Sequence, residues 1–284
     1  MNKADNVRKD VSEAYARAVN APAAKGCCCG SEVATKGAVA RVAGYTTEEM
    51  NSLPAEAAVN AFGCGNPVAF SQVKPGEVVL DLGSGAGIDL LLAAKKVGPE
   101  GRVIGVDMTD DMIARARENI REAGLDNVEV RKGIIESLPV EDASVDWVIS
   151  NCVINLSPEK EKVFAEIARV LRPGGRMLVS DIVVKDLPDW VRQDPTLYSS
   201  CVAGAISEEE YLEGLRQAGL QDAEVRSRLV YETSQLMAFA DSEVELLESG
   251  SCCGTPVDKN TAKRMLEGIQ GNIWSANIFA RKPA

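Results

Sequence analysis

The sequence has no histidine, although it contains eight cysteines among its 284 residues. Because histidine is the commonest general base and the commonest metal ligand in proteins, any chemistry here must proceed without imidazole. In a reducing compartment, cysteines serve as buried apolar residues, soft-metal ligands or redox-active thiols more often than as permanent disulfides. The positions of the cysteines must therefore decide which of these roles they have.

Long apolar runs and a positive net charge are also absent. No run approaches the roughly 18 to 20 apolar residues that span a bilayer, and the first residues lack the apolar stretch of a signal peptide. The formal net charge is −11, so phosphate backbones would on average be repelled. We therefore expect a cytoplasmic protein that acts on a small molecule, with no membrane and no nucleic acid as a partner.

Three parts of the chain differ in pattern. They are a helical N-terminal extension, a central domain and a small C-terminal region, predicted at residues 1–75, 76–232 and 233–284. The extension has an amphipathic helix around residues 11–18. It also has a loop that contains Cys27, Cys28 and Cys29, and the C-terminal region has a second cysteine loop that contains Cys252 and Cys253. Glycines flank both loops, which predicts flexible segments.

The central part alternates strands and helices. Strands are predicted at residues 77–82, 102–107, 127–131, 145–150 and 177–180, with helices between them at 88–94, 109–124 and 157–172. Thr109 is predicted to cap the second helix, and a capping box at Ser207 begins a later one. Further strands are predicted at 222–232 and 277–280. This alternation indicates an α/β fold with a doubly wound, largely parallel sheet.

A glycine-rich loop follows the first predicted strand. It runs from Asp81 to Gly87, and its glycines allow a backbone to approach a ligand closely. Asp107 ends the next strand, 24 residues after Gly83 (107 − 83), where a carboxylate can bind ribose hydroxyls. A tight strand–helix turn without a ligand is the alternative. The dinucleotide fingerprint is a weaker match, because its third glycine would fall at Ile88.

The loop begins with the acidic residue Asp81, and it resembles motif I of class I S-adenosylmethionine-dependent methyltransferases. The resemblance implies a Rossmann-like fold that binds S-adenosyl-L-methionine. The residues it assigns to this cofactor are Asp81, Gly83, Gly85 and Gly87 around the amino-acid end, Asp107 and Met108 at the ribose, Ile134 and Ile135 at the adenine, and Asn151. Plain burial beside a turn would explain either isoleucine equally well.

Cys152 directly follows the fourth predicted strand. In open parallel sheets, ligands bind beyond the carboxyl ends of the strands, so this thiol is expected to face the methyl group of the cofactor. A lone cysteine is otherwise commonly a small buried apolar residue.

Two longer strings make the resemblance more specific. Residues 150–156 read Ser-Asn-Cys-Val-Ile-Asn-Leu, and residues 201–205 read Cys-Val-Ala-Gly-Ala. Together with the glycine loop and the Gly-Cys-Gly at residues 63–65, these strings resemble arsenite methyltransferases. The resemblance covers roughly residues 5–230. Quinone methyltransferases share the loop but lack these cysteines. The family commonly has tyrosine where this chain has Phe62.

The family resemblance implies thiol ligands for arsenic(III). Cys152 and Cys201 would hold the arsenic, Cys64 would be a further thiol for binding and disulfide relay, and the fourth family cysteine would be Cys28 or Cys29. Trivalent arsenic is soft and prefers thiolates. It keeps a lone pair that can attack the sulfonium methyl group without a base, which agrees with the missing histidine.

Methyl transfer formally oxidises arsenic, and in this family a disulfide between enzyme cysteines is thought to restore the trivalent state. Thioredoxin or glutathione would then reduce the enzyme, and the substrate would be arsenite or its thiol conjugates. Cys252 and Cys253 could capture arsenite or belong to a dispensable tail.

Two other functions stay open from the residues alone. One is a C- or O-methyltransferase for a quinone-like small molecule. The other is a non-catalytic thiol-based protein that binds arsenic or another metal. Zinc is disfavoured, because the chain has no Cys-x2-Cys pair and no histidine.

Overall fold

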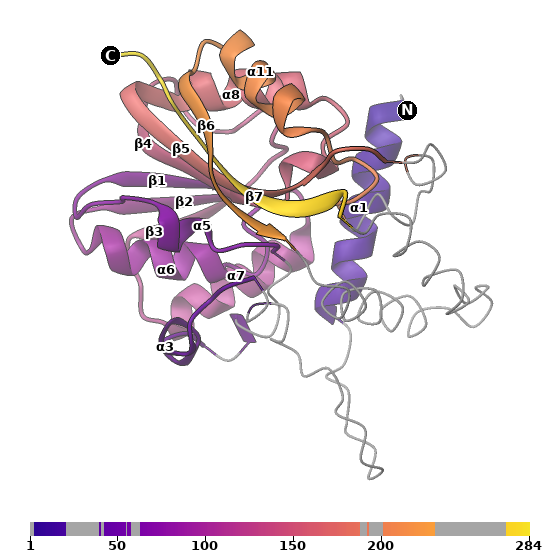
Figure 1. Cartoon of the computed structure of the whole chain (residues 1–284). Coiled ribbons are helices and arrows are strands. Elements are labelled where there is room, and N and C mark those ends of the chain that lie inside the picture. Colours follow the sequence, from indigo (N-terminus) through magenta and orange to yellow (C-terminus); the bar gives the residue numbers. More distant parts are fainter. Residues whose placement is uncertain are drawn as a thin grey trace, which may run out of the picture.

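A seven-stranded sheet forms the centre of the computed structural model (Figure 1). The structure describes residues 3–20, 40, 43–54, 56–57, 63–187, 192, 201–230 and 271–284. The strands are β1 Val78–Leu82, β2 Arg102–Asp107, β3 Val128–Lys132, β4 Val145–Asn151, β5 Leu171–Val184, β6 Gln221–Val230 and β7 Ile273–Arg281. Their order is β3-β2-β1-β4-β5-β7-β6. Strand β7 is antiparallel to both β5 and β6, and the other neighbouring pairs are parallel.

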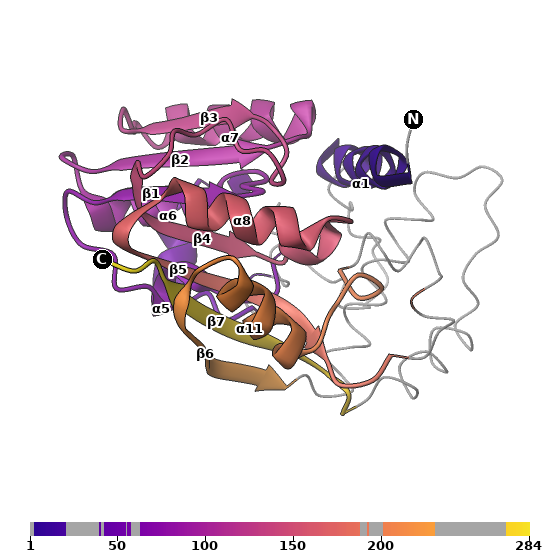
Figure 2. The same cartoon turned by 90° about the horizontal axis from the view of Figure 1, so that it is seen from above.

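Helices cover both faces of this sheet (Figures 1 and 2). The described helices are α1 Lys3–Asn20, α3 Thr47–Asn51, α5 Pro67–Phe70, α6 Ile88–Val97, α7 Asp110–Glu122, α8 Lys160–Val170 and α11 Glu208–Gln217, with a 3-10 turn at Ile154–Leu156. Helices α6 and α7 pack on one face, and α8 and α11 on the other. The prediction of a doubly wound α/β fold is confirmed.

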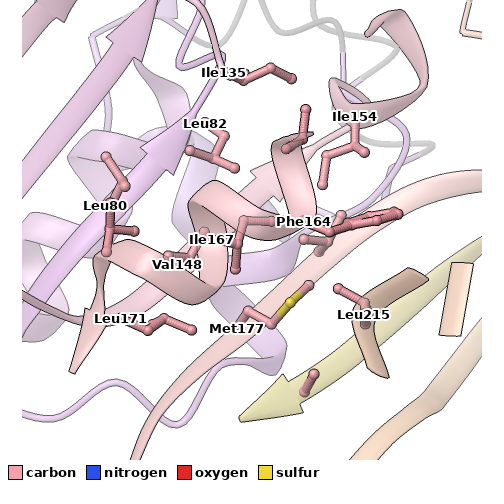
Figure 3. Close-up of a cluster of buried hydrophobic side chains, with 14 of the residues drawn as sticks. Leu80, Leu82, Ile135, Val148, Ile154, Phe164, Ile167, Leu171, Met177 and Leu215 are labelled. Atoms are coloured by element: carbon pink, nitrogen blue, oxygen red, sulfur yellow. The ribbon is translucent and has the colours of Figure 1, made fainter. Parts of the chain in front are cut away.

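The strands divide the apolar core into two layers. Because side chains alternate along a strand, Leu80 and Leu82 of β1 face α8, whereas Val79 faces α6. Figure 3 shows the first layer, in which Phe164 and Ile167 of α8 pack over the strands. No helix in the described part of the chain is long and apolar enough to cross a membrane.

Several predicted elements differ from the structure in detail. Strand β5 is much longer than predicted, and α8 begins at Lys160, after the 3-10 turn. Thr109 occupies the N-cap of α7, but its hydroxyl makes no capping bond and lies 3.1 Å from the hydroxyl of Ser12 in α1. The capping box at Ser207 is present as predicted.

Both predicted terminal regions contribute elements that pack with the central α/β unit. Strand β7 comes from the C-terminal region predicted at 233–284, yet it lies inside the sheet between β5 and β6. Helix α1 comes from the N-terminal extension and packs against α7. The described parts of these two regions, α1 and β7, therefore pack with elements of the central α/β unit.

Candidate active site

A pocket opens at the carboxyl ends of the parallel strands. After β3 the chain crosses to β4 on the other side of β1, and ligands of such sheets bind at this switch point. The pocket has about 930 Å³ of non-protein space, part of which is open solvent, and is lined by the loops after β1, β2, β3 and β4. Helix α1 lies beyond this end of the sheet (Figure 2) and contributes Arg8, Val11 and Tyr15 to the wall.

The glycine loop forms one wall of the pocket. Gly83, Gly85 and Gly87 have φ angles of 64°, 51° and 94°, which side chains strongly disfavour. A Cβ atom on Gly83 would lie 2.5 Å from Cγ1 of Val153, so no side chain fits there. The Gly85 N–H donates a hydrogen bond of 2.9 Å to the Asp107 carboxylate. The loop is thus held against the end of β2 with its backbone facing the pocket.

Three acidic side chains gather in this part of the pocket. Burial raises the pKa of Asp81 well above its ordinary value, and the neighbouring charges of Asp89 and Asp107 raise it further. Burial also raises the pKa of Asp89 to about 6. The pKa of Asp107 is raised by burial, although N–H groups of Thr109 and Gly85 oppose the shift. Buried carboxylates in this arrangement favour a cationic ligand.

The opposite part of the pocket is apolar. Met108, which follows β2, and Ile134 and Ile135, in the turn after β3, line it. Glu136 at its rim accepts hydrogen bonds from Ser157 Oγ at 2.6 Å and from Arg8 Nε at 3.1 Å. The pocket therefore combines a group of carboxyl side chains with apolar ones.

Three predicted cysteines meet at one wall. Cys64 and Cys152 form a disulfide with Cα atoms 5.7 Å apart, and the Cys201 thiol donates to the backbone oxygen of Cys152 at 2.7 Å. All three side chains are buried, and Cys152 also lines the pocket. Cys152 and Cys201 have φ angles of 61° and 64°, and such strain in non-glycine residues clusters at functional sites.

Asp181 lies beside these thiols and was missed by the sequence analysis. A carboxylate oxygen of Asp181 and the sulfurs of Cys64 and Cys152 lie within 4.8 Å of one another. Asp181 is fully buried, and burial raises its pKa to about 7. The available signal was a lone acid within the apolar stretch that forms β5.

A second missed group surrounds Asn151. The Tyr45 hydroxyl donates to Asp89 at 2.8 Å and accepts from the amide of Asn151 at 2.8 Å. The Asn151 carbonyl oxygen accepts from the backbone N–H groups of Cys64 and Gly65. No local pattern links Tyr45 to residues of β4, so this group could not be found from the sequence.

The remaining predicted thiols lie outside the residues that the structure describes. These are Cys28 and Cys29 with their neighbour Cys27, and Cys252 and Cys253. Phe62 also lies outside them.

Comparison with known proteins gives consistent matches. A family model for a methyltransferase domain matches residues 73–219. The arsenite methyltransferase of Halobacterium salinarum is 46% identical over 260 residues, covering 91% of this chain and 59% of that protein. A demethylmenaquinone methyltransferase of Listeria welshimeri is 35% identical over 119 residues, covering 42% of this chain and 50% of that protein. The chain thus spans only about half to three fifths of these relatives.

A solved structure agrees with these matches. The crystal structure of an arsenic(III) S-adenosylmethionine methyltransferase from Chlamydomonas reinhardtii is 32% identical to this chain, with a TM-score of 0.54. The match covers 87% of this chain and 73% of that one. It extends well beyond the generic methyltransferase domain.

Proposed function

The chain belongs to the family of arsenic(III) S-adenosylmethionine methyltransferases, and we propose that it transfers methyl groups from S-adenosylmethionine to thiolate-bound trivalent arsenic. The observation that carries this proposal is the cluster of Cys64, Cys152 and Cys201 at the wall of the glycine-loop pocket. The share of the chain that aligns with an arsenite methyltransferase also supports arsenic as the methyl acceptor. The arsenite methyltransferase relative aligns with 91% of the chain, whereas the quinone methyltransferase relative aligns with 42%.

The pocket has the chemistry that S-adenosylmethionine requires. Asp81 and Asp89 are buried carboxyl groups whose charged form the ammonium group of the ligand would stabilise, and the glycine loop leaves room for its backbone-like amino-acid end. Asp107 is the candidate for the ribose hydroxyls, as predicted, and Ile134 and Ile135 supply an apolar surface for the adenine. Met108 and Gly87 belong to the same walls.

The three thiols provide a soft ligand set for arsenic. S-adenosylmethionine supplies an electrophilic methyl group on sulfur, and arsenic bound by thiolates keeps the lone pair that accepts it. Because the nucleophile carries no proton, the chain needs no histidine as a general base. Cys152 touches the pocket and Cys201 touches Cys152, so arsenic held between them lies next to the donor.

The disulfide between Cys64 and Cys152 supports a redox step after methyl transfer. Two thiolates that become a disulfide release two electrons, which return pentavalent arsenic to the trivalent state. Reduction of this disulfide by thioredoxin or glutathione would restore the ligand set, with Cys28 or Cys29 as candidate relay thiols. Cys252 and Cys253 are candidates for arsenite capture.

The test is turnover with methyl-labelled S-adenosylmethionine, arsenite and a thiol reductant, followed by chromatographic separation of arsenic species. We expect labelled methylarsenicals from the unmodified protein and none from Cys152→Ser or Cys201→Ser. Retained binding of S-adenosylhomocysteine by both variants is the control for an intact donor pocket.

Two outcomes would contradict the proposal. Full methylation of arsenite by both cysteine variants would remove the thiol site from the reaction. Arsenite binding without any methylated product would support a sequestering protein, and turnover of a quinone by the cysteine variants would support the small-molecule methyltransferase alternative.

A further inference from the structure

The side chain of Asn151 forms hydrogen bonds with the loop that carries Cys64. Its Oδ1 atom accepts hydrogen bonds from the backbone N–H groups of Cys64 at 2.9 Å and Gly65 at 3.1 Å. Its Nδ2 atom donates to the Gly65 carbonyl oxygen at 2.7 Å. Three main-chain groups of this short loop therefore bond to one amide.

The other contacts of the same amide reach into the donor pocket. Nδ2 also lies 2.8 Å from the Tyr45 hydroxyl and 3.2 Å from Oδ2 of Asp89, and the Tyr45 hydroxyl donates to Oδ1 of Asp89. Tyr45 and Asp89 are both buried. The Cys64 loop is thus connected through one amide to an acid of the pocket.

Close packing leaves this loop little freedom. A Cβ atom on Gly63 would lie 2.2 Å from Nδ2 of Asn151, and one on Gly65 would lie 2.6 Å from Cβ of Ser180. The two glycines let the backbone pass close to Asn151 at the end of β4 and to Ser180 of β5. The Asn151 amide then supplies three hydrogen bonds to main-chain groups of this loop.

We propose that Asn151 is a positioning residue that holds Cys64 within reach of Cys152, with Tyr45 and Asp89 fixing the orientation of its amide. The sequence predicts a cofactor role for Asn151, and Asn151 does line the pocket. Its hydrogen bonds, however, go to the Cys64 loop and to Tyr45 and Asp89. The role in catalysis rests on the proposed function, whereas the positioning itself does not.

The direct readout is the closure of the Cys64–Cys152 disulfide in reduced protein without arsenite or S-adenosylmethionine. Oxidised glutathione is the oxidant: two thiols lose two protons and two electrons, one disulfide forms, and two glutathione molecules are released. Alkylation at timed points and peptide mass mapping give the rate for this pair. Because a misplacement of about 1 Å can slow a reaction on the order of a hundredfold, we expect Asn151→Ala to slow closure about tenfold.

Three variants make the test specific. Tyr45→Phe removes one hydroxyl and should slow closure about threefold, which provides a milder probe if Asn151→Ala does not fold. Gly63→Ala places a methyl group against Nδ2 and should act like Asn151→Ala. Asn127→Ala is the matched control, because its amide bridges Gly98 and Gly101 away from the pocket; closure should stay within twofold of wild type.

A closure rate of Asn151→Ala within threefold of wild type would overturn the proposal, as would a Tyr45→Phe rate equal to wild type if only that variant folds. In turnover, we expect Asn151→Ala to lower kcat about tenfold while the Kd for S-adenosylhomocysteine stays within threefold. Weaker donor binding with normal closure would make Asn151 a donor ligand instead. If the wild-type protein methylates no arsenic, the proposed function fails, and the closure rates still decide the positioning role.

Discussion

Replacing Asp181 by asparagine should stabilise the arsenite-free protein at neutral pH and leave it unchanged in acid. The Oδ1 atom of Asp181 accepts hydrogen bonds from the Ile182 N–H at 3.0 Å and from Asn155 Nδ2 at 2.9 Å, and its Oδ2 accepts from the Tyr211 hydroxyl at 3.4 Å. An asparagine carbonyl can keep the first two bonds. Its NH2 group can donate to the Tyr211 oxygen, so the polar contacts survive the change.

The magnitude follows from the pKa of the buried carboxyl. Burial raises the Asp181 pKa from an ordinary value of 3.8 to about 7, although the Lys160 charge opposes the shift. A pKa raised in the folded state contributes stability that is fully present below the unfolded value and is lost as the pH rises to the folded value. Between pH 4 and pH 7 the wild-type protein therefore loses up to about 4 kcal/mol that the asparagine variant keeps.

Urea unfolding of both proteins at pH 4, 5.5 and 8 measures this difference, with the Cys64–Cys152 disulfide in the same state in each sample. Titrating groups that do not interact with Asp181, such as Asp81 and Asp89, are common to both proteins and cancel in the comparison. We expect the advantage of Asp181→Asn to grow with pH and to level off above pH 7. A difference that is independent of pH, or a less stable variant at pH 8, would refute the reasoning.

Three further predictions follow from close packing and from α1. Gly83→Ala should cost about 1–3 kcal/mol more unfolding free energy than Gly85→Ala, because only the first Cβ meets a neighbour; equal losses in urea unfolding would contradict this. Gly214→Ala should lower the Tm, because the added Cβ would lie 2.5 Å from the Phe164 ring. The resulting overpacking costs about 1–3 kcal/mol, whereas the higher helix propensity of alanine contributes about 1 kcal/mol. A raised Tm would contradict the close contact between α8 and α11. Arg8→Met removes the ion pairs of α1 with two glutamates and should weaken S-adenosylhomocysteine binding about tenfold in calorimetry; unchanged affinity would exclude α1 from the donor site.

Local pattern was sufficient for most elements near the pocket. The strand, glycine loop and helix from 78 to 97 were predictable, because strand alternation, positive φ and helix periodicity each depend on a few adjacent residues. The same holds for the helix that begins after Ser207. Strand β7 was placed correctly along the chain but not in the sheet, because its partners β5 and β6 are distant in sequence.

Some residues of the site could likewise be predicted from local pattern, whereas others depend on contacts between distant parts of the chain. Asp81 and Asp107 lie at the carboxyl ends of β1 and β2, and Cys152 follows β4. These strand ends share one edge of the sheet, so the gathering of the three residues could be predicted from the order of elements alone. Asp181 and Tyr45 carry no motif, and their roles arise from neighbours 29 to 117 residues away (181 − 152 and 181 − 64).

The sequence by itself determined that a glycine loop, a following acid and a set of cysteines occur together in a chain without histidine. These are properties of composition and short spacing, and they identify the donor and the softness of the acceptor site. Only the tertiary structure decided that Cys64 pairs with Cys152, that Asp181 lies beside them and that Asn151 holds the Cys64 loop. Such contacts depend on how the ends of β4 and β5 and the segment before β1 pack together, which no local pattern encodes.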